Sequence, residues 1–147
     1  MKKLLLFLLM ILLSEMVSAT RAWVGPILYD FNMETKEALV DSYSSALSGD
    51  VSIPYIVTYG GIEYHVVGFK GSAFANCSSI TSVTISEGIK SIDYRAFYNC
   101  NNLSSISIPY SCIEICDEVF CDCVNLTSVT IPEGVKSIGY RAFSGCI

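Results

Sequence analysis

The stretch LTSVTIPEGVKSIGYRAFSGC, residues 126–146, decides the fold of this chain of 147 residues. Its apolar positions recur 23 residues earlier, and again 23 before that, without an insertion. Two of these columns are Phe74, Phe97, Phe120 and Phe143, and Cys77, Cys100, Cys123 and Cys146. Many independent columns that share one period indicate a repeat protein, in which each unit buries its apolar face only against its neighbours.

Each unit contains a short run in which apolar and hydroxyl residues alternate, as in Val83-Thr84-Ile85. Period-two alternation predicts strands at about 82–86, 105–108 and 128–131, and the shared period places them in one parallel sheet. Pro109 and Pro132 end two of these strands, because proline cannot donate to a ladder. A second extended stretch follows, as at 89–92. The Ala-Phe-x-x-Cys segment after it predicts a helical turn or a short 3₁₀ piece.

The pattern Leu-x-x-Ile-x-Ile-Pro, then Val-x-x-Ile-Gly, then Ala-Phe-x-x-Cys resembles the BspA-like leucine-rich repeats, over residues 67–147. The resemblance implies a mostly β leucine-rich-repeat solenoid with a parallel sheet and short helical turns. It extends upstream, where residues 38–40, 49–54 and 59–66 are similar to the segment that begins such proteins. We interpret residues 20–66 as an N-terminal β capping segment of short hairpins, with a turn at Gly60-Gly61. A cap covers the apolar end and open strand edge of the first unit.

Residues 1–19 have the layout of a secretory signal peptide. Lys2 and Lys3 precede an apolar run from Leu4 to Leu13, and Val17-Ser18-Ala19 supplies the small residues before a cleavage site. The run is too short for a membrane span, which needs about 20 residues. We therefore expect cleavage after Ala19, a secreted or cell-surface protein, and no membrane insertion of the mature chain.

The sequence departs from the repeat pattern at two places. The third unit carries three additional cysteines, and an exported chain permits disulfides; the additional ones are Cys112, Cys116 and Cys121. We expect this trio to be the better disulfide candidate, and the repeated cysteine column to hold buried free thiols. The second departure is that the sequence stops at Ile147 without a polar capping unit. Either it is a fragment of a longer gene or another chain covers its end, and we favour the fragment.

Composition and motifs argue against several classes of function. The net charge is −5, and Lys2 and Lys3 belong to the leader, so no basic patch for nucleic acid is expected. His65, the single histidine, lies in an alternating run and is interpreted as a partly exposed strand residue, because nothing brings a nucleophile to it. The cysteine spacings do not match paired zinc motifs. We expect no catalytic residue, no metal and no cofactor.

The outward strand residues are small hydroxyls in two columns, and they form the candidate binding surface: Ser82, Thr84, Ser105, Ser107, Ser128 and Thr130. Such a surface favours a protein or glycan ligand, on a host cell or in matrix, which agrees with the adhesion role that the resemblance implies. The turns around Glu87, Tyr110 and Glu133 are the second choice. The alternative function is a repeat spacer or binding domain of a longer secreted enzyme or surface protein. Asn102 and Asn125 match the glycosylation pattern, or are simply turn asparagines.

Overall fold

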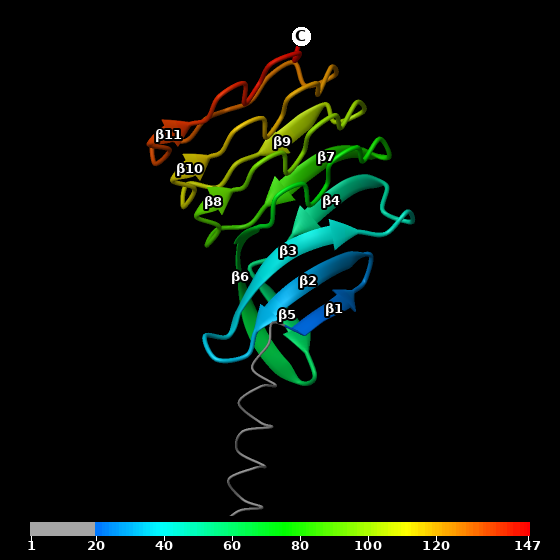
Figure 1. The fold of residues 1–147 in the computed structure, drawn as a ribbon, viewed down its shortest axis with the longest axis vertical. Helices are drawn as coiled ribbons and strands as arrows, with labels where there is room; N and C mark the ends of the chain where they lie inside the picture. Colours follow the sequence, from blue (N-terminus) through cyan, green and yellow to red (C-terminus); the bar gives the residue numbers. More distant parts are fainter. Residues whose placement is uncertain (1–19) are drawn as a thin grey trace, which may run out of the picture.

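The computed structural model describes residues 20–147, so the signal peptide predicted at 1–19 lies outside the described residues. Short strands joined by turns build this region, and no helix occurs within it (Figure 1). The strands are β1 (Thr20–Val24), β2 (Ile27–Asn32), β3 (Glu37–Tyr43), β4 (Gly49–Ile53), β5 (Ile56–Tyr59), β6 (Ile62–Phe69), β7 (Ile80–Ile85), β8 (Ser91–Ile92), β9 (Ser105–Ser107), β10 (Glu114–Ile115) and β11 (Ser137–Ile138).

The N-terminal region is built from hairpins, as predicted. β1, β2 and β3 pair antiparallel in sequence order, and β5 pairs antiparallel with β6. Gly60 and Gly61 form the two-residue turn between Tyr59 and Ile62, with φ of 59° and 77°. A two-residue turn with positive φ at both positions matches the twist of the flanking strands, and only glycine adopts it without strain.

The rest of the chain forms stacked coils with two parallel ladders on different sides (Figure 1). One ladder runs β4-β7-β9, and the other continues from β6 through β8 and β10 to β11. Val83 pairs with Ile106 in register, which confirms the predicted parallel sheet and its 23-residue period. Ser91 and Ile92 pair with Glu114 and Ile115, so the second extended stretch is also a ladder.

The third predicted strand, 128–131, is wrong in extent. Within the described residues only Thr130 bridges to Ser107 in this segment. The segment has a neighbour on one side only, and its apolar side chains are less covered. Ile131 is 36% exposed, whereas Ile85 and Ile108 of the same column are 4% and 7% exposed. Burial in this fold therefore depends on a coil on each side.

The Ala-Phe-x-x-Cys segments are turns, so the predicted helical turn or 3₁₀ piece is wrong. Their backbone N–H groups alternate between two kinds of acceptor. In the first coil, the N–H groups of Ser72, Phe74 and Asn76 donate to carbonyls of the next coil, at 2.7–2.8 Å. The N–H groups between them donate within the turn, to the residue three positions back. Ser72 and Asn76 have φ of 65° and 63°, which a right-handed helix excludes.

The core of the coils is a stack of the repeated phenylalanines. The rings of Phe74, Phe97 and Phe120 are fully buried, and neighbouring ring centroids lie 5.3 and 5.6 Å apart in parallel orientation. Phe143 continues the stack at 5.2 Å but is only partly buried. These distances follow the spacing of the coils, which is the spacing of hydrogen-bonded strands. The repeated phenylalanines thus form an interior column, in agreement with the apolar face that the repeat pattern predicts for each unit.

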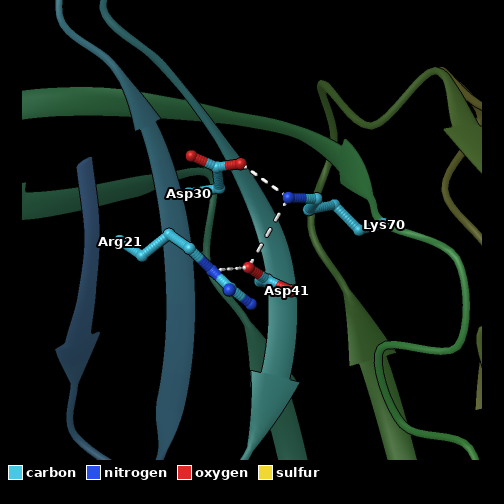
Figure 2. A network of polar contacts seen from close by, with 4 residues as sticks. All are labelled: Arg21, Asp30, Asp41 and Lys70. Carbon is cyan, nitrogen blue, oxygen red and sulfur yellow. Dashed lines mark hydrogen bonds and ion pairs between the residues drawn. The ribbon is translucent and has the colours of Figure 1, made fainter. Parts of the chain in front are cut away.

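An ion-pair network joins the hairpins to the first coil (Figure 2). Lys70, just after β6, places its Nζ 2.7 Å from Asp30 on β2 and 3.6 Å from Asp41 on β3. Arg21 on β1 pairs with the same Asp41 carboxylate. The hydrogen bond from Lys70 to Asp30 raises the pKa of the lysine. Three strands and the chain entering the coils are thus held by one group of charges.

Candidate functional site

The structure pairs five of the six predicted hydroxyl residues across neighbouring coils, along the β4-β7-β9 ladder and the segment that follows it. Ser82 pairs with Ser105, Thr84 with Ser107, and Ser107 bridges to Thr130. Ser82 is half-buried and the other five are exposed. We call this surface the hydroxyl face: Ser82, Thr84, Ser105, Ser107, Ser128 and Thr130.

Strand β4 adds a rung to this face that the sequence reasoning missed. Asp50 pairs with Ser82 and Ser52 pairs with Thr84, so they head the two columns. The Asp50 carboxylate accepts hydrogen bonds from Ser82 Oγ at 2.5 Å and Thr81 Oγ1 at 3.2 Å. These bonds, the first from Ser82, lower the pKa of Asp50. The face therefore begins with a carboxylate.

A sequence signal for this rung was present. Residues 51–55, VSIPY, match residues 106–110, ISIPY, at four of five positions. The signal is masked because Val51 lies 32 residues before its partner Val83 rather than 23, since the β5–β6 hairpin intervenes. The match also shows that Tyr55 occupies the position of Tyr110 in its own unit.

The turns after the ladder strands form a second column beside the hydroxyl face. We call it the tyrosine–glutamate column, because the two residue types alternate along the stack: Tyr55, Glu87, Tyr110 and Glu133. Tyr55 is 46% exposed and Tyr110 is 80% exposed. The Tyr55 ring covers Gly88, where an added Cβ would meet it at 2.5 Å. Tyr55 is thus packed onto the next turn, whereas Tyr110 projects from the edge of the coils.

Glu87 fixes the backbone that carries Tyr110. Its carboxylate accepts from the N–H of Tyr110 at 3.0 Å and from the N–H of Ser111 at 2.9 Å. These two backbone donors, first that of Tyr110, lower the pKa of Glu87. Ser111 Oγ donates to the Ile89 carbonyl and accepts from the N–H of Gly88, each at 2.9 Å. The exposed Tyr110 ring is therefore carried by a turn whose backbone is fixed by hydrogen bonds.

A groove of about 350 Å³ lies between the hydroxyl face and Tyr110. Ile106 and Ile108 line its apolar part, and they are 8% and 7% exposed. Ser107 and Thr130 supply hydroxyls, and the remaining lining residues are Tyr110 and Pro132. The groove is open to a ligand that combines apolar surface with hydrogen-bonding groups. A second hollow of about 420 Å³ lies against the last coil, around Leu126 and Phe143.

The cysteines are free thiols in the described chain, so the disulfide expected among Cys112, Cys116 and Cys121 is not formed. The repeated column behaves as expected, with buried thiols in the inner coils. Cys100 Sγ donates to the Phe74 carbonyl at 3.1 Å, and the next coils repeat this contact at 3.0 and 3.2 Å. Burial raises the pKa of Cys146 to about 11, which keeps that thiol protonated.

His65 and the sequon asparagines take the structural roles that the sequence left open to them. His65 is exposed on β6, with its ring 4.8 Å from that of Tyr55, which confirms the strand interpretation. Asn102 Nδ2 donates to the Ser78 carbonyl at 2.7 Å, and Asn125 Nδ2 to the Asn101 carbonyl at 2.6 Å. Both amides therefore tie one coil to the previous one. Residues 20–147 contain no helix of the length and hydropathy that a membrane span requires.

Stacked coils with parallel ladders and a repeated column of buried phenylalanines define a leucine-rich repeat protein. The BspA-type leucine-rich repeat region matches residues 57–147 in six copies, and the chain belongs to this family. The domain boundary predicted between residues 66 and 67 stays a prediction.

Solved structures agree with this assignment. A leucine-rich repeat protein from Bacteroides ovatus is 35% identical over 85% of this chain, with a TM-score of 0.80. One from Bacteroides capillosus is 30% identical over 80% of this chain and 86% of its own, with a TM-score of 0.74. A leucine-rich cell surface protein from Faecalibacterium prausnitzii is 26% identical over 88% of this chain and 41% of its own, with a TM-score of 0.72. This chain spans 33% of the B. ovatus protein. No curated protein matches it.

Proposed function

We propose that the chain is a non-catalytic interaction module, secreted or held at the cell surface, that adheres to a protein or glycan ligand through its hydroxyl face. One observation carries the proposal. Small hydroxyl side chains stand in two columns across successive coils, and five of the six are exposed, so each coil adds the same kind of contact. Repeated weak contacts give an affinity that grows with the number of rungs.

Localisation rests on two observations. Residues 1–19 have the pattern of a secretory leader. The F. prausnitzii relative is described as a cell surface protein. A protein at the cell surface or outside the cell can reach the ligand to which we propose it adheres.

A second function is favoured by the comparison of lengths. This chain spans about a third of the B. ovatus relative, so the same coils suit a spacer or binding domain within a longer surface protein or secreted enzyme. The hydroxyl face serves binding in either case, whereas a pure spacer needs no specific face.

The test replaces Thr84, Ser107 and Thr130 together by glutamine, which is longer but neutral. All three side chains are exposed, so the thermal melt is expected to stay within a few degrees of the parent. Adhesion to immobilised extracellular matrix or host cells is expected to be lost. A triple variant that folds and adheres like the parent would show that the hydroxyl face is not the binding surface.

A further inference from the structure

The ladder side of the coils has an unusual distribution of charge. The strand-and-turn segments 48–55, 78–88, 101–111 and 124–134 contain no lysine, arginine or histidine. They contain three carboxylates, those of Asp50, Glu87 and Glu133. The basic residues of the described chain all lie elsewhere, on the hairpins, the second ladder and the Ala-Phe turns: Arg21, Lys36, Lys70, Lys90, Arg95, Lys136 and Arg141. These segments of the stack are therefore acidic and carry no basic side chain of their own.

The tyrosine–glutamate column adds aromatic rings to these carboxylates. The Glu87 carboxylate lies within hydrogen-bond distance of the Tyr110 backbone. The next turn packs on Tyr110 from the other side, where a Cβ added to Gly134 would lie 2.6 Å from the Tyr110 carbonyl oxygen. This places Glu133 one coil from the ring. An exposed aromatic ring attracts a cation to its face through its quadrupole, and a glutamate on the turn before and on the turn after Tyr110 adds negative charge to this edge of the coils.

We propose that the groove at Tyr110 binds an arginine or lysine side chain of an extended basic segment in a partner protein. The proposal rests on the function proposed for the hydroxyl face and names the class of ligand. The cationic head group lies over the Tyr110 ring near Glu133, and its aliphatic stem lies in the groove over Ile106 and Ile108. Ser107 and Thr130 accept hydrogen bonds from N–H groups of the ligand.

The held turn makes this binding favourable. Glu87 and Ser111 already fix the backbone of Tyr110, so the turn loses little conformational entropy when a ligand binds.

The spacing of the column suggests the probe. Tyr55 and Tyr110 are two coils apart, which is about 10 Å at the spacing of neighbouring strands. A polyproline II peptide places every third residue on one face, about 9 Å apart. The peptide (Arg-Pro-Pro)₃ presents cations at this interval. The same peptide with citrulline in place of arginine keeps the shape and removes the charge.

Titration calorimetry of the intact chain at low salt is the measurement. The citrulline peptide is expected to bind about tenfold more weakly than the arginine peptide, and Tyr110→Ala is expected to cost a similar factor. Tyr110→Phe keeps the ring and should retain most of the affinity. Glu133→Gln should weaken binding about twofold to threefold, whereas Glu34→Gln, the same charge change in the β2–β3 turn, should not.

A pair of variants of opposite sign isolates the charge. Ser107→Lys and Ser107→Glu crowd the groove to a similar extent, but the lysine is expected to weaken binding of the arginine peptide and the glutamate to strengthen it. Equal binding of the citrulline peptide, or equal effects of the two Ser107 variants, would overturn the proposal. Binding of a neutral oligosaccharide that requires Tyr110, without peptide binding, would overturn it in favour of a saccharide site.

The outcomes separate this proposal from the adhesion proposed above. If the glutamine triple variant loses adhesion but Tyr110→Ala changes neither adhesion nor peptide binding, the hydroxyl face is the surface and the groove proposal is wrong. If Tyr110→Ala weakens peptide binding about tenfold but the triple variant adheres normally, the groove binds cations and the adhesion proposal is wrong.

Discussion

The hairpin region and the coils solve the same problem, the burial of apolar strand faces, in different ways. In the hairpin region, strands β1, β2 and β3 pair with their neighbours in sequence, and different aromatic residues pack together, since the ring of Phe31 lies 5.0 and 4.7 Å from those of Tyr59 and Tyr64. In the coils, the stacked phenylalanines lie 23 positions apart in sequence, and the same residue type repeats along the column. Phe31 is thus buried by rings of its own region, whereas Phe97 is buried by the coils on both sides of it.

The last coil shows what this dependence means. Ile92 and Ile115 are fully buried, but Ile138, in the same column of the second ladder, is 51% exposed. Sequence identity within a column is therefore not enough for burial, because the environment comes from the adjacent coils. The predictions below test this difference between the two regions.

The largest expected effect is at the phenylalanine stack. Phe97→Ala and Phe120→Ala should each lower the free energy of unfolding by about 3–5 kcal/mol, because a buried ring between two coils leaves a cavity. Phe143→Ala, with a ring stacked on one side only, should cost less than about half of that. Urea denaturation checks the three variants. Equal losses for Phe120 and Phe143 would contradict burial by two neighbours.

A smaller effect is expected where the two regions meet. Asp41→Asn should lower the free energy of unfolding by about 1–2 kcal/mol, because the carboxylate is 9% exposed and faces both Lys70 and Arg21. The partners are themselves partly exposed, which limits the loss. Glu63→Gln, an exposed carboxylate on β6, is the matched control and should change stability little. If the two variants melt alike, the network does not hold the hairpins to the coils.

The smallest effect concerns Glu87. The pKa of Glu87 is lower in the folded chain than in the unfolded one. The ionised carboxylate therefore stabilises the fold at pH values above the ordinary pKa of glutamate, and this stabilisation is lost as the pH falls through the pKa of the folded state. The urea midpoint, followed from neutral pH down to about pH 3, should fall less steeply in Glu87→Gln than in the parent. Parallel curves would mean that the bonds to Tyr110 and Ser111 do not persist in solution.

The sequence alone was sufficient to predict the features of this protein that follow from its 23-residue period and from local turn residues. The spacing of Phe97 and Phe120 predicted the buried column. The alternation around Val83 predicted a strand that pairs in parallel with the next coil, and Gly60-Gly61 predicted the hairpin turn. It also placed the candidate hydroxyl face on one side of the ladder. These features follow from local periodicity, which the fold repeats.

Only the tertiary structure decided what depends on partners outside the local pattern. The Ala-Phe segments are turns and not helices, because alternate N–H groups such as that of Phe74 find acceptors in the next coil. Strand β4 pairs with β7 although the β5–β6 hairpin is inserted between them in sequence. Asp50 on β4 therefore lies at the start of the hydroxyl face, opposite Ser82. Lys70 and Asp30 are 40 positions apart in sequence. Their separation does not follow the 23-residue period, so the sequence pattern does not predict that these two charges meet.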